Sequence, residues 1–184
     1  MEKILKTGLD GAYGEIMVIG YAIEDSEPQA IFRDSIEASE KEMLTQWFET
    51  LTTQLKLLSK SDNPIVKIIG HNVRAFDNMF LYNRCVILGV RPPQWFLRCL
   101  DSSPYSDEVF DTMTRFCGFR NTISLSKLVD VLDLQAKGSE IEEEIDGSQV
   151  WSFIEQNKIN EVVEYCKGDV KRCQQAYKRM NFLD

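Results

Sequence analysis

Residues 65–77 read IVKIIGHNVRAFD, and this stretch decides the class of fold. Residues 65–70 form an apolar run rich in isoleucine and valine, which predicts a buried strand. A polar turn follows from His71, and an acid, Asp77, stands where a new apolar pattern starts. That pattern predicts a helix over residues 76–88. A buried strand that leads directly into a helix is typical of an α/β protein.

The segments on either side extend this alternation. Apolar runs at residues 16–23 and 30–32 predict two more strands, and residues 109–113 fit either a short strand or the start of a helix. We expect residues 92–106 to be irregular and residues 137–146 to form an acidic loop. Apolar residues at steps of three and four, together with capping signals, predict helices over residues 39–59, 124–134, 148–154 and 159–180. The order predicts a mixed sheet covered by helices, in a single domain spanning residues 1–184.

Composition limits the classes of function. The net charge of −8 argues against non-specific binding to bare nucleic acid. The five cysteines are odd in number and lack a CxxC pair, so we expect neither disulfides nor a metal–thiolate site, which fits a reducing cytoplasm. The apolar runs are far shorter than the ~18 residues of a membrane span. The first residues lack the apolar region of a signal peptide, so we expect a cytoplasmic protein without membrane contact.

The last predicted helix carries an acid on its apolar side. Tyr165 and Asp169 are four residues apart and therefore share one face of that helix. An acid among apolar side chains is costly unless a cation or hydrogen bonds satisfy it, which makes Asp169 a candidate functional residue. In the alternative interpretation, Asp169 lies at the edge of the apolar stripe and reaches water, Lys171 or Arg172.

The turn after the central strand offers a second candidate acid. Asp77 stands at the start of a helix, at the carboxyl end of a strand, where α/β proteins place their sites. The alternative is that Asp77 only stabilises the N-terminus of the helix. His71, the single histidine of the chain, fits either a site residue or a packed, hydrogen-bonded side chain.

Taken together, the two segments resemble the DEDD superfamily of 3′–5′ exonucleases. The stretch Gly70-His71-Asn72-x4-Asp77 is similar to the second motif of these enzymes, and Tyr165-x3-Asp169 to the third motif of the DEDDy branch. The chain looks like the predicted 3′–5′ exonucleases related to the proofreading domain of family B polymerases, also in residues 14–16, 110–113, 123–128, 145–150 and 165–166. The resemblance covers nearly the whole chain. It implies an RNase H-like α/β fold with a mixed five-stranded sheet flanked by helices.

The resemblance also implies a chemistry. In this family four carboxylates hold two divalent metal ions, Mg or Mn, which activate a water and stabilise the leaving 3′-oxygen. By motif, Asp77 and Asp169 are the catalytic acids and metal ligands, and Tyr165 is the catalytic residue that orients the water. Asn72 and Phe76 are implied to bind the nucleic acid, at the terminal nucleotide of a single-stranded DNA or RNA 3′ end.

The first motif of the family, an Asp-x-Glu pair, is absent. It should precede residues 7–10, which read TGLD, but Lys3 and Leu5 stand where the two acids belong. No spacing rule supports Asp10 or Glu15 as a replacement. The mapped charge changes from about −4 to about −1, so we expect Mg or Mn to bind weakly and hydrolysis to be slower by many orders of magnitude.

Two functions compete on this evidence. The first is a metal-dependent 3′–5′ exonuclease with a degenerate metal site. The second is a catalytically inactive relative that binds nucleic acid or a protein partner. Basic residues on the last helix could give it local positive charge for nucleic acid, or could simply be solvated: Lys167, Lys171, Arg172, Lys178 and Arg179. A third and weaker possibility is a structural subunit whose acidic loop at residues 137–146 docks a partner.

Overall fold

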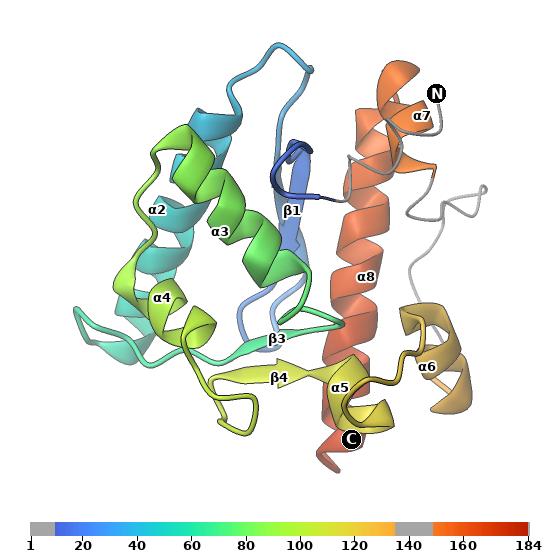
Figure 1. The fold of residues 1–184 in the computed structure, drawn as a ribbon. Coiled ribbons are helices and arrows are strands. Elements are labelled where there is room, and N and C mark those ends of the chain that lie inside the picture. The colour runs from blue at the N-terminus through green and yellow to red at the C-terminus, as the bar shows by residue number, and fades with distance from the viewer. Residues whose placement is uncertain (1–9, 135–148, 184) are drawn as a thin grey trace. The chain divides into compact units, whose positions relative to one another are not determined.

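The computed structural model describes residues 10–134 and 149–183. The acidic loop at residues 137–146, the expected cap Ser148, and Lys3 and Leu5 lie outside these residues. The described residues form short strands and helices (Figure 1). Their order is β1 (Val18–Tyr21), β2 (Gln29–Phe32), α2 (Glu40–Ser59), β3 (Ile68–Gly70), α3 (Asp77–Leu88), α4 (Gln94–Leu100), β4 (Val109–Asp111), α5 (Thr112–Cys117), α6 (Leu125–Val131), α7 (Val150–Glu155) and α8 (Ile159–Met180). The mixed α/β character predicted from the sequence is confirmed.

The described residues fall into two compact units. Residues 10–16 and 39–111 form the first unit, and residues 17–38, 112–134 and 149–183 form the second. Each unit is therefore assembled from segments that are distant in the sequence. The single domain expected over residues 1–184 stays a prediction. Over the described residues, no helix combines the length and the apolar character needed to cross a membrane.

The first unit is organised around helix α2 and a parallel strand pair. Ser39 caps α2 by accepting a hydrogen bond from the Glu42 amide at 3.2 Å, as the sequence predicted. The buried face of α2 meets α4 through aromatic rings that pack edge to face: Trp47, Phe48, Trp95 and Phe96. Strand β3 pairs in parallel with β4, and Gly70 lies opposite Asp111.

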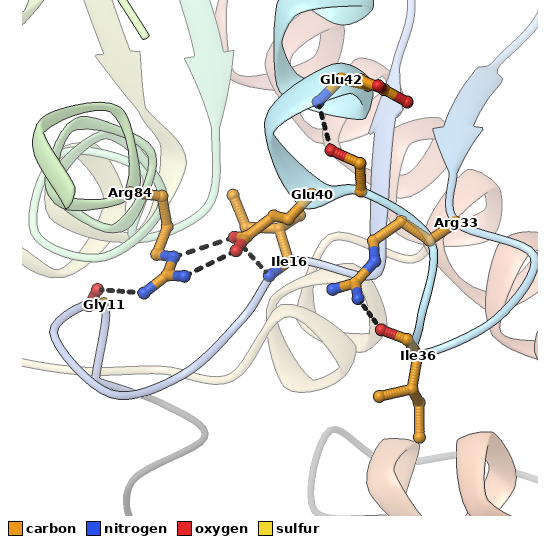
Figure 2. A network of polar contacts seen from close by, with 8 residues as sticks. Gly11, Ile16, Arg33, Ile36, Glu40, Glu42 and Arg84 are labelled. Carbon is orange, nitrogen blue, oxygen red and sulfur yellow. Dashed lines mark hydrogen bonds and ion pairs between the residues drawn. The ribbon is translucent and has the colours of Figure 1, made fainter. Parts of the chain in front are cut away.

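A buried ion pair joins α2 to α3 in the same unit (Figure 2). The guanidinium of Arg84 donates two hydrogen bonds to the carboxylate of Glu40, at 2.9 and 2.6 Å, and both side chains are more than nine-tenths buried. Glu40 also accepts from the amide of Ile16 at 2.9 Å, and Arg84 donates to the carbonyl of Gly11 at 3.4 Å. The pair therefore fixes residues 11–16 against the two helices. The hydrogen bonds with Glu40 and the negative charge of that carboxylate raise the pKa of Arg84 above its ordinary value.

The second unit is a β-hairpin packed against the long helix α8 (Figure 1). Strands β1 and β2 are antiparallel, with Val18 opposite Phe32. Gly20 allows the helix to approach, because a Cβ atom there would lie 3.0 Å from the Cys166 carbonyl oxygen. Helices α5, α6 and α7 also contact α8. A small core forms around Met17, Ile154 and Val162.

Two expectations about the fold differ from the structure. The described residues form two sheets of two strands each, so the five-stranded mixed sheet is not shown. The expectation that residues 92–106 are irregular was wrong for Gln94–Leu100, which is helix α4, and correct for the residues on either side. Pro93 is its N-cap, a place where a proline does not interrupt helical hydrogen bonds, and Trp95, Phe96 and Cys99 are buried.

Residues 109–113, for which the sequence allowed a short strand or the start of a helix, contain both. Strand β4 ends at Asp111, and helix α5 begins at the next residue, Thr112. Both residues are buried, at 5% and 0% exposure. A strand that continues directly into a helix leaves no turn signal in the sequence, which is why the pattern could not separate them.

Candidate functional site

The turn between β3 and α3 is held by a buried carboxylate. Asp111, at the end of β4, accepts hydrogen bonds from the amides of Asn72 at 3.0 Å and Arg74 at 3.2 Å. Asn72 has a left-handed backbone with a φ of 58°, which asparagine tolerates better than most residues. Parallel pairing places Asp111 opposite Gly70, directly beside this turn. Asp111 therefore fixes the backbone of the expected nucleic-acid-binding segment.

The side chain of Arg74 holds the same turn from another direction. Its guanidinium donates to the carbonyl and the hydroxyl of Ser102, at 3.2 and 3.1 Å, and to the carbonyl of Val109 at 3.1 Å. Val73, between the two anchored amides, is buried beside Cys99 and Val109. The turn is thus a fixed platform, built by contacts that are remote in the sequence.

Asp77 and Phe76 lie at the start of α3. Asp77 is the first residue of the helix and is exposed, and the N-cap position is Phe76. The N-cap residue Phe76 makes no side-chain capping hydrogen bond, and the negative charge of Asp77 in the first turn is favourable at the positive end of the helix dipole. The Phe76 ring is 36% exposed and lies 5.8 Å from the ring of Phe80.

Helix α8 carries Tyr165 and Asp169 as the spacing predicted. Burial raises the pKa of Tyr165 to about 12, and the negative charge of Asp169 and a hydrogen bond to it add to the effect. The hydroxyl of Tyr165 therefore stays protonated at neutral pH. On its other side, Asp169 accepts a hydrogen bond from Arg172 at 2.8 Å. Asp169 thus pairs with Arg172, one of the nearby bases named in the alternative interpretation.

A comparison with protein families decides what kind of chain carries these residues. The model of a family described as predicted 3′–5′ exonucleases related to the exonuclease domain of PolB matches residues 15–184. The chain belongs to this family. The family predicted from the sequence is confirmed, and the match includes all five site residues proposed from the motifs: Asn72, Phe76, Asp77, Tyr165 and Asp169. No curated protein and no solved structure matches the chain.

The metal chemistry implied by the resemblance needs several acids at one place. Within the described part of the chain, no group of three or more histidine, cysteine, aspartate or glutamate side chains could hold a metal ion. Asp77 belongs to the first unit and Asp169 to the second, so their joint role stays a prediction. Asp169 already faces the guanidinium of Arg172, so the described residues show no donor set for a two-metal centre.

The basic residues of α8 do not form an unpaired positive face in this exonuclease-like chain. Lys167 pairs with Glu164 at 2.8 Å on the same helix. Two others bind acids of the β1–β2 hairpin, Lys171 with Glu27 at 3.3 Å and Lys178 with Asp25 at 2.8 Å; Arg179 donates to the Leu132 carbonyl. Because these charges have intramolecular partners, they contribute less to the binding of nucleic acid than the sequence suggested.

Sequence reasoning missed one residue of this region, Asp111. The resemblance covered residues 110–113 as a family stretch but assigned no role to the acid. Its role depends on the pairing of β3 with β4, two strands about forty residues apart in the chain. The available signal was an acid at the end of a strand, the same signal that singled out Asp77.

Proposed function

We propose that this chain acts at the 3′ end of single-stranded DNA or RNA, as a DEDDy-type member of its family with an RNase H-like fold and a degenerate metal site. The observation that supports this most directly is the Tyr165–Asp169 pair on α8, joined by a hydrogen bond in a chain that belongs to an exonuclease family. Tyrosine and aspartate at this spacing are the parts of the third motif that carry chemistry.

Each site residue has a role in this proposal. The exposed ring of Phe76 offers a face on which the terminal base can stack. Asn72, whose carbonyl accepts a hydrogen bond from the Phe76 amide at 3.0 Å, offers a polar side chain nearby. Tyr165 donates its proton in a hydrogen bond to Asp169, and its hydroxyl oxygen can accept a hydrogen bond from an attacking water and so orient it. Asp77 and Asp169 act as the remaining acids of the site. They bind Mg or Mn weakly, because only two of the four family carboxylates are in place.

A second candidate is a catalytically inactive module that binds nucleic acid or a protein partner. The ion pair between Asp169 and Arg172 favours it, because a carboxylate that is neutralised by a guanidinium is a poor metal ligand. The substitution of both first-motif acids, by Lys3 and Leu5, acts in the same direction.

The two candidates are separated by one degradation assay. The wild-type chain, Asp169→Ala and the control Asp130→Ala, an exposed acid on α6, are incubated with end-labelled single strands and Mn²⁺. We expect slow loss of nucleotides from the 3′ end with wild type and Asp130→Ala, and none with Asp169→Ala. Strand binding that survives a chelator, without degradation, would support the inactive module. If neither binding nor degradation is seen, the exonuclease and the nucleic-acid-binding module are both wrong, and only the module that binds a protein partner is left.

A further inference from the structure

Asp169 is held by donors from both neighbouring turns of α8. Tyr165 lies four residues before it and hydrogen-bonds to it, and Arg172 lies three residues after it with Nη1 at 2.8 Å from Oδ1. Both spacings bring side chains onto the same face of a helix. Helix geometry alone therefore places a neutral donor and a cation beside this carboxylate.

The partial burial of the ion pair makes it more than a surface contact. The Arg172 side chain is 18% exposed and that of Asp169 is 34% exposed, whereas the exposed pair of Lys56 with Asp62 has values of 43% and 102%. Charges that are partly removed from water are screened less by solvent and salt. Arg172 therefore interacts with Asp169 more strongly than an ordinary surface base does.

The other basic residue near Asp169 is engaged elsewhere. Lys171 binds Glu27 of the β1–β2 hairpin at 3.3 Å. Of the two bases that the sequence offered as partners for Asp169, the structure thus selects Arg172. A guanidinium also has the planar donor geometry that matches a carboxylate.

We propose that Arg172 is a built-in counter-ion that competes with divalent cations for Asp169. A divalent ion that approaches Asp169 meets a carboxylate whose charge is already balanced, and it is repelled by the guanidinium beside it. The metal can bind only when Arg172 moves away. This inference rests on the proposed function, because it takes Asp169 as the acid that would hold the metal.

Titration of the full-length chain with Mn²⁺ by calorimetry tests this without nucleic acid. Arg172→Gln, which removes the charge and keeps a side chain of moderate length, should bind Mn²⁺ about ten-fold more tightly than wild type. Arg172→Lys keeps the charge and should stay near wild type. Arg179→Gln is the matched control, because it removes an arginine of the same helix whose partner is the Leu132 carbonyl. Circular dichroism confirms that each variant is folded.

Equal Mn²⁺ affinity of wild type and Arg172→Gln would overturn the inference, and so would an equal gain in Arg179→Gln. The double variant Asp169→Ala/Arg172→Gln must lose the gain; if the gain persists, the ion binds elsewhere and the inference is wrong. Failure of the proposed function gives a different result. In that case Arg172→Gln still tightens Mn²⁺ binding, but Asp169→Ala leaves strand binding and degradation unchanged.

Discussion

The phenol of Tyr165 is the residue whose environment can be measured most directly. Burial and the adjacent Asp169 carboxylate raise its pKa to about 12. The folded state thus holds this proton more tightly than the unfolded chain, where a tyrosine titrates near 10. Its contribution to stability is complete below about pH 10 and is lost as the pH rises towards 12.

We predict that the alkaline titration of wild type contains one tyrosine near pH 12 that is missing from Tyr165→Phe. The difference between the two ultraviolet phenolate titrations isolates this residue. A difference curve centred near pH 10 would show that Tyr165 is solvated and lies apart from Asp169.

The buried pair of Glu40 and Arg84 should carry a large share of the stability of the first unit. Arg84→Ala leaves a buried carboxylate without its cation, so we predict a loss of about 3–5 kcal/mol in the free energy of unfolding. Lys56→Ala, which breaks the exposed pair with Asp62, should cost less than about 1 kcal/mol. Urea unfolding followed by circular dichroism compares the two, and similar losses would contradict the burial of the pair.

At the scale of elements, the turn from β3 to α3 depends on strand β4. Asp111→Asn keeps the shape of the side chain but replaces one acceptor oxygen by an amide group, so one of the two turn amides loses its partner. We predict a loss of about 1–3 kcal/mol and faster hydrogen exchange at Asn72 and Arg74. The control is Asp107→Asn, a fully exposed acid near the same strand. Unchanged exchange at both amides would show that Asp111 does not hold the turn.

The contact between α8 and β1 should tolerate no side chain at Gly20. A Cβ atom there would lie 3.0 Å from the Cys166 carbonyl oxygen, which belongs to the helix backbone and cannot easily move. We predict that Gly20→Ala lowers the free energy of unfolding by about 1–3 kcal/mol. Gly168→Ala, in α8 with open space around its Cβ position, should instead raise it by about 0.5–1 kcal/mol. Thermal unfolding of the two variants measures the direction of each change in stability. An unchanged stability of Gly20→Ala would contradict the close approach of α8 to β1.

Sequence patterns predicted the helices best. The apolar stripe and the last residue of α8 were predicted correctly, and so was the Ser39 cap of α2. These features depend on residues close together in the sequence. Strands β1 and β3 proved shorter than their apolar runs, and β3 keeps three of six expected residues, whereas β2 begins one residue earlier than expected. Helix α4 was missed because a pair of prolines was interpreted as the start of an irregular segment rather than of a helix.

For the candidate site, too, contacts between residues close in the sequence could be predicted and distant ones could not. Tyr165 and Asp169 could be predicted as neighbours because four residues make about one helical turn. The partner of Asp169 was left open between Lys171 and Arg172. The structure shows Arg172, three residues further along the helix, paired with Asp169, and Lys171 paired with Glu27 of the hairpin. The ion pair of Glu40 with Arg84 and the role of Asp111 join residues far apart in the chain, which no local pattern reports.

At the scale of the whole molecule, net charge and family both favour binding to the end of a nucleic acid rather than binding along its length. The chain has a net charge of −8, and the basic residues of α8 pair with the chain's own acids and carbonyls. An acidic protein without an unpaired basic face on this helix gains little from long runs of phosphate. A member of a 3′–5′ exonuclease family is therefore expected to recognise the terminus itself.

The most direct test of this account is a competition for binding between two single strands of identical sequence. The chain is first bound to a labelled linear strand in the presence of a chelator, and unlabelled competitors are then added. We predict that a linear competitor with a free 3′ end displaces the label and that a circular competitor, which has no end, does not. Equal displacement by the circular strand, or no binding of the labelled strand at all, would contradict recognition of 3′ ends by this chain.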